Sequence, residues 1–157
     1  MYFVMIALLL VALPAGSVAL EFLRHPHDHL FIVSSAGSWW TFWAVGVRLS
    51  LAGIRQVIQP RFTAAEIFDA HEPASLPIVR EVGFSNLAFG TLGVLSLFRH
   101  DWIVPAAIVG GLYYGLAGLG HVLRKNKNST EWTAMISDFG VCLILGVFLF
   151  RTLCCSM

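Results

Sequence analysis

Five apolar runs, each about as long as a membrane-crossing helix, constrain this chain more than any other feature of its sequence. An α-helix rises 1.5 Å per residue, so about 20 apolar residues cross the roughly 30 Å of hydrocarbon in a bilayer. The runs cover Tyr2 to Leu23, Ser38 to Gln59, Ile78 to Phe98, Ile103 to Leu123 and Thr133 to Leu153. The sequence therefore predicts an all-α polytopic membrane protein of about five transmembrane helices, with helices two to five as a four-helix bundle core.

Composition supports a membrane environment and excludes several classes of function. Of the 157 residues, 57% are hydrophobic and 12% are charged, whereas a soluble domain carries roughly 25% charged residues. The formal net charge of +1 gives no field that would attract nucleic acid, so nucleic-acid binding is excluded. Cys142, Cys154 and Cys155 have no metal-binding spacing. We expect one transmembrane domain over residues 1–157, with the lipid bilayer as its main partner and no cofactor.

The N-terminal run has two interpretations, and the links between runs predict an orientation. Ser17-Val18-Ala19 resembles a signal-peptidase site, but no Lys or Arg precedes the run, which favours a retained helix. Positive residues are retained on the cytoplasmic side, and their distribution predicts a cytoplasmic N terminus. On the N-terminal side lie Arg55, Arg61, Arg80, Arg124, Lys125 and Lys127, against Arg24, Arg99 and Arg151 on the other.

Two links carry helix-capping patterns. Pro60 to Pro77 is the longest link, and within it Thr63 with Glu66 makes a capping box that opens a short helix along the membrane surface. This helix carries Ala64, Ile67 and Phe68. In the link before helix five, Asn128-Ser129-Thr130 is predicted on the cytoplasmic side, where it caps that helix.

Polar and charged side chains inside the predicted helices form the candidate site. A charged side chain at mid-bilayer costs about 2.5 to 3.5 kcal/mol on insertion scales, so such residues usually face the bundle and find partners. Arg48 and Arg55 lie two turns apart on one stripe of helix two, and the other charges lie near the same cytoplasmic end of their helices. The candidate ligand-binding residues are Arg48, Arg55, Glu81, Asn86, Tyr114, His121 and Asp138.

This polar layer has a structural and a functional interpretation. In the first, Arg55 with Glu81 and His121 with Asp138 are inter-helix pairs that only fix the packing, so every charge is paired and no void remains. In the second, the layer lines a pocket that opens to the cytoplasmic leaflet and binds a small polar or quinone-like headgroup, with Arg48 or Arg55 pointing into a cavity. A proton or ion path through the layer is a third alternative.

Other patterns have mainly structural interpretations. The segment His25-Pro26-His27-Asp28-His29 is either a wet interfacial loop or a zinc- or copper-binding segment. Stripes of small residues allow close helix packing, or contact with a partner in a larger complex. These stripes are Ala107, Gly111 and Gly115 on helix four, and Gly83, Asn86, Gly90 and Gly93 on helix three. An interfacial aromatic belt is predicted from Trp39, Trp40, Trp43 and Trp102.

Several short motifs are shared with a known group of membrane proteins. They are Ala52-Gly53-Ile54-Arg55 before Pro60, Thr63 to Phe68, Arg80 to Phe84, Asn86 to Gly90, Gly118 to His121, and Ser137-Asp138. On these motifs residues 38 to 153 resemble the DoxX-like small integral membrane proteins and related uncharacterised bacterial families, with the first helix as an addition. The resemblance implies a compact bundle in a bacterial inner membrane, of a type associated with redox or quinone-linked complexes. It carries over no catalytic residue.

Together these observations predict a small membrane protein that acts as an accessory or a small-ligand binding protein, with a quinone or a lipid as ligand. No nucleophile with its base, phosphate-binding loop or closed metal site is recognisable, so we do not expect an enzyme. The alternatives are a structural subunit of a larger membrane complex or a homo-oligomer, a quinone-linked oxidoreductase in which Glu81 or His121 handles protons, and a proton or ion transporter.

Overall fold

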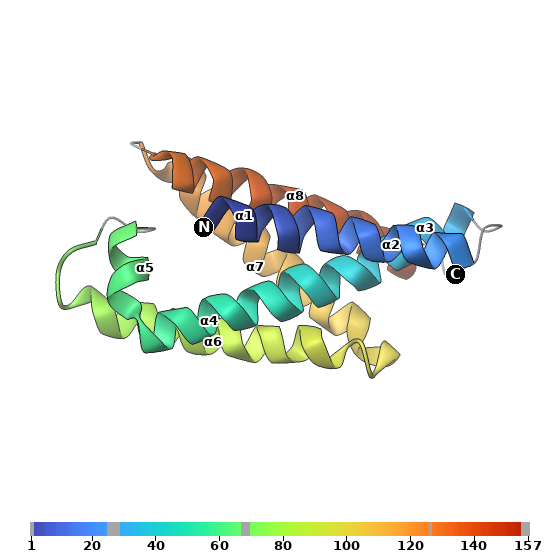
Figure 1. Ribbon diagram of the computed structural model, residues 1–157, viewed down its shortest axis with the longest axis horizontal. Coiled ribbons are helices and arrows are strands. Elements are labelled where there is room, and N and C mark those ends of the chain that lie inside the picture. Colours follow the sequence, from blue (N-terminus) through green and yellow to red (C-terminus); the bar gives the residue numbers. More distant parts are fainter. Residues whose placement is uncertain (1, 25–28, 67–69, 126, 155–157) are drawn as a thin grey trace.

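The computed structural model describes residues 2–24, 29–66, 70–125 and 127–154, and consists of long helices that run along one common axis (Figure 1). The first helix is continuous through α1 (Tyr2–Ala7), the π-helical turn η1 (Leu8–Ala12) and α2 (Leu13–Arg24). The second is continuous through α3 (His29–Trp40), the π-helical segment η2 (Thr41–Arg48) and α4 (Leu49–Ile58). The remaining elements are α5 (Pro60–Glu66), α6 (Ser75–Leu95), the 3₁₀ turn η3 (His100–Trp102), α7 (Ile103–Leu123) and α8 (Ser129–Cys154).

The predicted fold class is confirmed. The described residues contain helices and no strand, and four helices are long and apolar enough to cross a membrane. These are Phe3–Arg24, Ser75–Leu95, His100–Leu123 and Ser129–Cys154. The helical stretch 29–58, which carries both candidate arginines, packs in the middle of the bundle against α6, α7 and α8. Several helix boundaries differ from the predicted ones, most importantly that of α8, which begins at Ser129 and not at Thr133.

Glycines set the closest helix contacts. The second helix packs mainly on α6, and a Cβ atom added to Gly93 would lie 2.4 Å from the backbone nitrogen of Gly46. One added to Gly53 would lie 2.7 Å from the carbonyl oxygen of Gly83. A side chain at any of these positions would therefore push the two helices apart. The predicted small-residue stripe on helix three is confirmed as a packing face, in agreement with the role of small residues between membrane helices.

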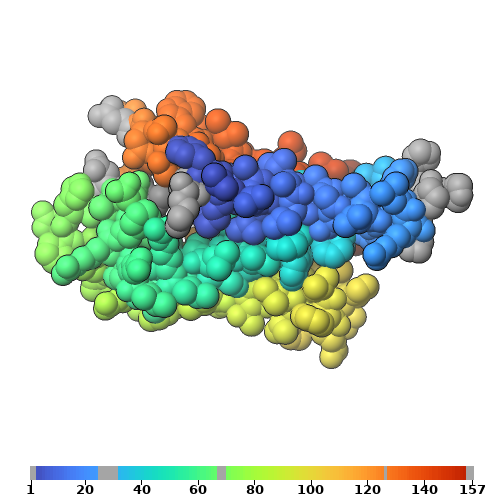
Figure 2. Space-filling view, in the orientation of Figure 1, coloured from blue at the N-terminus to red at the C-terminus, as the bar shows by residue number. Residues whose placement is uncertain are grey.

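The first helix is part of the core. Ile6 and Leu10 belong to the same buried apolar cluster as Val45, Tyr114 and Leu145, which come from the second, fourth and fifth long helices. In Figure 2 the blue first helix lies against the cyan and green second helix along this face of the molecule. The outward faces of the bundle are apolar as well, as expected for helices whose outer surfaces contact lipid acyl chains.

A polar seam joins α2 to α3 at one end of the bundle (Figure 1). Glu21 Oε2 accepts hydrogen bonds from Ser35 Oγ at 2.5 Å and from Trp39 Nε1 at 2.6 Å. Trp43 Nε1 donates to Ser17 Oγ at 3.1 Å. Two tryptophans that were predicted as membrane anchors therefore also hold the first helix to the second through hydrogen bonds.

The short helix α5 lies at the other end, the same end as the start of α1, and runs across the bundle axis (Figure 1), where it packs on α4 and α6. It begins at Pro60, whose missing N–H and fixed φ suit the first position of a helix. Thr63 therefore lies within the helix, where it is buried, and the predicted capping box with Glu66 is wrong. Pro60 and Ala64 face the bundle on the same side, whereas residues 67 and 68 of the predicted helix lie outside the described residues.

Candidate functional site

A cavity of about 510 Å³ lies between the helices at the end of the bundle that holds α1 and α5. Every long helix contributes to its wall, and α5 does so too. Its lining is mainly apolar, with Met5, Ala52, Phe62 and Ala117 among the apolar members. A mostly apolar cavity of this volume with a few converging polar groups is typical of a site for a small molecule.

Most of the predicted ligand-binding residues meet at this cavity. Those that line it are Arg48, Arg55, Asn86, Tyr114, His121 and Asp138. The seventh, Glu81, is exposed on α6 and lies outside the lining. Helical residues advance by about 100° each, so Gly83 and Asn86, which face α4, place Glu81 on the opposite side of α6. The inclusion of Glu81 in the layer is therefore corrected by the structure.

Arg48 and Asp138 form an ion pair deep in the bundle. Both terminal nitrogens of Arg48 lie 3.4 Å from Asp138 Oδ1, and the two side chains are 11% and 6% exposed. Arg48 also lies over the ring of Tyr114, 5.0 Å from its centre, and the Tyr114 hydroxyl donates to the carbonyl oxygen of Ala44 at 2.5 Å. This arrangement neutralises the deepest charge and orients the guanidinium at the cavity wall.

The depth of Asp138 explains this pairing. Because α8 begins at Ser129, Asp138 lies nine residues into the helix, which corresponds to about 14 Å. Arg48 lies ten residues before the end of α4 at Ile58, or about 15 Å from that end. The two residues therefore stand at similar depths, and the acid that pairs with His121 is Glu131 rather than Asp138.

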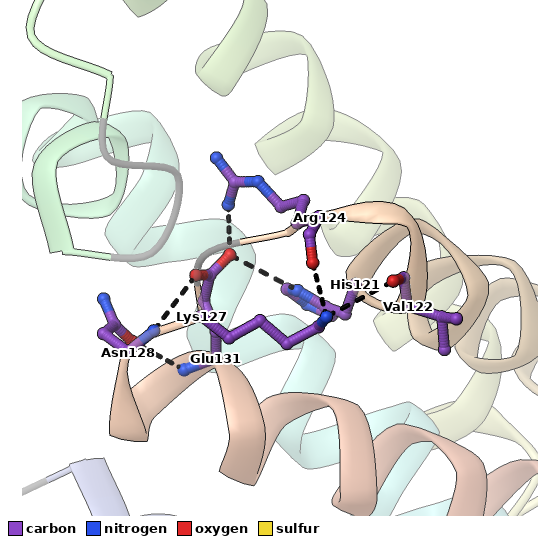
Figure 3. Close-up of polar contacts among 6 residues, drawn as sticks. All are labelled: His121, Val122, Arg124, Lys127, Asn128 and Glu131. Atoms are coloured by element: carbon purple, nitrogen blue, oxygen red, sulfur yellow. Dashed lines mark hydrogen bonds and ion pairs between the residues drawn. The ribbon is translucent and has the colours of Figure 1, made fainter.

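A compact polar cluster closes the link between α7 and α8 (Figure 3). Glu131 Oε1 accepts a hydrogen bond from Arg124 and lies 3.8 Å from His121 Nδ1. Glu131 also forms a reciprocal capping box with Asn128: its backbone N–H donates to Asn128 Oδ1 at 2.8 Å, and its Oε2 accepts from the Asn128 N–H at 3.4 Å. The predicted capping role of this segment is confirmed for Asn128.

Two polar groups of the cavity wall, Asn86 Oδ1 and Arg55, lack a hydrogen-bond donor and a carboxylate, respectively, among the described residues. Asn86 is 2% exposed and its Nδ2 donates to Gln56 Oε1 at 2.7 Å, but its Oδ1 accepts no hydrogen bond from any described residue. The Arg55 guanidinium carbon lies 3.6 Å from the ring centre of Phe62. In the described part of the chain Arg55 forms no ion pair with a carboxylate, so the predicted pair with Glu81 is not formed.

Comparison with known protein families gives a match to a family that has no assigned function. The family model that matches covers residues 2–155 and describes a family of unknown function, DUF6790. The chain belongs to this family. No curated protein and no solved structure matches it. The DUF6790 match includes the first helix, which contributes Met5 to the cavity wall, and the resemblance to DoxX-like proteins stays a prediction.

Sequence reasoning missed several residues of this DUF6790 site. Gln56 and Tyr113 are adjacent to predicted site residues and also line the cavity, as do Thr63 and Arg124. Glu131 was missed because helix five was predicted to begin after it, although Asn128 and Glu131 have the spacing of a capping box. A polar residue inside an apolar helix, such as Gln56, is itself a signal that sequence reasoning can use.

The remaining patterns add no second site to the described structure. The segment His25 to His29 and Cys155 lie outside the residues whose side chains are described. Within the described ranges, no group of three or more His, Cys, Asp or Glu side chains is placed to hold a metal ion. Cys142 is half-buried between α7 and α8, against Gly115, and Cys154 is exposed at the end of α8.

Proposed function

We propose that this protein is a membrane-embedded binding protein for a small lipid-soluble molecule with a polar headgroup, such as a lipid or a quinone. The observation that carries the proposal is the buried Asn86 Oδ1, which has no hydrogen-bond donor among the described residues, in the wall of a cavity of about 510 Å³. A buried acceptor without a donor costs about 1 to 3 kcal/mol. A ligand that supplies the donor removes this cost.

The cavity also argues against the purely structural interpretation. That interpretation requires every charge of the layer to be paired and no void between the helices. In the described part of the chain Arg55 has no carboxylate partner, and it lines a cavity of about 510 Å³. We propose an accessory role in which the cavity binds a molecule.

The position of the cavity suggests how a ligand enters. The cavity lies at the end of the bundle that holds the start of α1 and the short helix α5. The distribution of Lys and Arg favours a cytoplasmic location for this end. On this basis we propose a multi-pass protein of a bacterial inner membrane that takes its ligand from the cytoplasmic leaflet.

Filling the cavity tests the proposal. Ala117 lines the cavity on α7, and its neighbour Leu116 is 67% exposed on the outer face of the same helix. Ala117→Phe should displace the ligand, and Leu116→Phe should not. Native mass spectrometry of protein extracted gently with its own lipids is the measurement, with thermal unfolding of both variants as the check on folding.

The expected result is a stoichiometric bound molecule in the wild type and in Leu116→Phe, and its loss in a folded Ala117→Phe. A wild-type chain that is bare, or a bound molecule that Ala117→Phe retains, contradicts a ligand in this cavity. Detection of the chain only within a larger assembly, with no small molecule, favours a structural subunit instead.

A further inference from the structure

The charges around the cavity do not balance, and the excess lies at one residue. Arg48 is paired with Asp138, and Arg124 is paired with Glu131. Arg55 lines the same cavity, and the described residues supply no carboxylate to it. Among the described residues, the wall therefore carries one positive charge that no carboxylate compensates. An anionic group bound in the cavity would neutralise it.

The surroundings of Arg55 suit an oxyanion. Its guanidinium carbon lies 3.6 Å from the centre of the Phe62 ring, so the aromatic ring of α5 covers the group and restricts its orientation. A guanidinium presents a rigid fork of N–H donors that matches the oxygens of a phosphate or a carboxylate. Helix α5 thus holds the cation of α4 in place at the cavity wall.

A second requirement comes from the neighbouring residue. Gln56 follows Arg55 on α4, and its Oε1 accepts the hydrogen bond from Asn86 Nδ2 at 2.7 Å. The donor side of the Asn86 amide is therefore used, and its Oδ1 is left as an acceptor in the cavity wall. A ligand group that donates a hydrogen bond, such as a hydroxyl, would satisfy it. An oxidised quinone could accept a hydrogen bond from Arg55. It would leave the charge of Arg55 uncompensated and Asn86 Oδ1 without a donor, so it fits this wall less well than an anion with a hydroxyl group.

We propose that the cavity binds a singly charged oxyanion that carries a hydroxyl group, with the oxyanion at Arg55, the hydroxyl at Asn86 and an apolar portion against the remaining wall. A phosphoglycerol group has this chemistry. It is the headgroup of an anionic phospholipid, where the phosphodiester carries one negative charge. It also occurs in free glycerol phosphate, whose phosphomonoester carries about −1.5 to −2 near pH 7. This assignment rests on the proposed binding function and names the class of ligand.

Lipids that differ in charge or in a single hydroxyl group test the requirement for an anion at Arg55 separately from the requirement for a hydroxyl at Asn86. Full-length protein is placed in phosphatidylcholine nanodiscs that contain a small fraction of phosphatidylglycerol, or of phosphatidylethanol, which has the same charge without a free hydroxyl. Bound lipid is counted by native mass spectrometry. The wild type should retain phosphatidylglycerol at least tenfold over phosphatidylcholine, and should retain phosphatidylethanol to a smaller degree. Equal retention of the three lipids would overturn the assignment.

Substitutions assign each preference to a residue. Arg55→Gln should abolish the preference for both anionic lipids, and Asn86→Leu should abolish only the preference for phosphatidylglycerol over phosphatidylethanol. Arg61→Gln removes an exposed charge of α5 next to the site and is the control, because it should change neither preference. A preference that Arg55→Gln retains would contradict the role of Arg55. The wild-type lipid series decides the ligand class even if a variant fails to fold.

Two further arms distinguish the source of the ligand and the level at which the proposal fails. Displacement of phosphatidylglycerol by millimolar glycerol phosphate would support the same headgroup chemistry with a soluble source, and no displacement would support the lipid. If ubiquinone binds and Ala117→Phe blocks it while phosphatidylglycerol shows no preference, the ligand class is wrong and the binding function stands. If no probe binds in a way that Ala117→Phe blocks, both are wrong.

Discussion

The α2–α3 seam and the cavity are two polar regions in one apolar bundle. They differ in whether their polar side chains find hydrogen-bond or ion-pair partners within the protein. In the seam, the Glu21 carboxylate accepts from both Ser35 and Trp39, so the donors that face it are used. In the cavity wall, the described residues give Asn86 Oδ1 no hydrogen-bond donor and Arg55 no carboxylate, and open space adjoins both. A carboxylate in a membrane helix therefore does not by itself indicate a binding site. Polar groups without protein partners do indicate one when they border a cavity.

The largest effect is expected from breaking the ion pair that borders the cavity. Asp138→Leu leaves the Arg48 guanidinium, which is 11% exposed, without its carboxylate. Removing one partner of a buried ion pair costs about 3 to 5 kcal/mol, because the remaining charge stays desolvated. Thermal unfolding of the purified protein in detergent measures the change, and we expect a clear fall in the midpoint temperature.

The double variant Arg48→Met, Asp138→Leu is the control for this prediction. Replacing both members of a buried pair by apolar side chains is often neutral or stabilising, so the double variant should recover most of the lost stability. A single variant as stable as the wild type would show that the pair does not hold α8 against the second helix. Arg48, like Arg55, would then be a cation that a ligand could bind.

The sequence predicts the architecture well because apolar runs and glycine spacing are local signals. The start and end of α7 agree with the predicted run, and the glycine stripe of α6 contacts the second helix as expected. Helix ends are harder to predict. The capping box of Asn128 and Glu131 extends α8 by a turn beyond its apolar run, because a cap satisfies backbone N–H groups without any apolar residue.

Errors in helix ends produced the errors in the site. A helix that begins one turn earlier places Asp138 about 6 Å deeper than predicted, which brings it to Arg48 and leaves Glu131 for His121. The exposure of Glu81 follows from which face of α6 packs on α4. The lack of a partner for Asn86 Oδ1 depends on distances between side chains of different helices, which no pattern along the sequence contains.

A smaller effect is expected from the seam. Glu21→Leu removes the acceptor of Ser35 and Trp39 and leaves both donors without it. Hydrogen bonds to charged groups contribute about 1.5 to 3 kcal/mol, and the seam is only partly buried, so we expect a loss of about 2 kcal/mol. Glu21→Gln keeps an acceptor oxygen and should lose less.

Glu21→Leu and Glu21→Gln also test whether the seam and the cavity are independent of each other. Lipid retention measured by native mass spectrometry should be unchanged in Glu21→Leu, because the seam contributes no residue to the cavity wall. A fall in lipid retention without a fall in stability would show that the first helix transmits changes at Glu21 to the cavity. The seam and the cavity would then not be independent polar regions.

The smallest effect is expected from the cap of α8, which lies at the same end of the bundle as the cavity. Asn128→Ala removes the side chain that accepts from the Glu131 N–H at 2.8 Å, and the loss of an N-cap costs about 1 kcal/mol. Asn128→Asp retains the acceptor and should be close to the wild type. Both variants keep the Glu131 carboxylate opposite Arg124, so the charge balance of the cavity is preserved and lipid preference should not change. A changed lipid preference in Asn128→Ala with full stability would mean that the position of Glu131 affects ligand binding. The paired polar groups of the cap and the unpaired groups of the cavity wall would then act as one network.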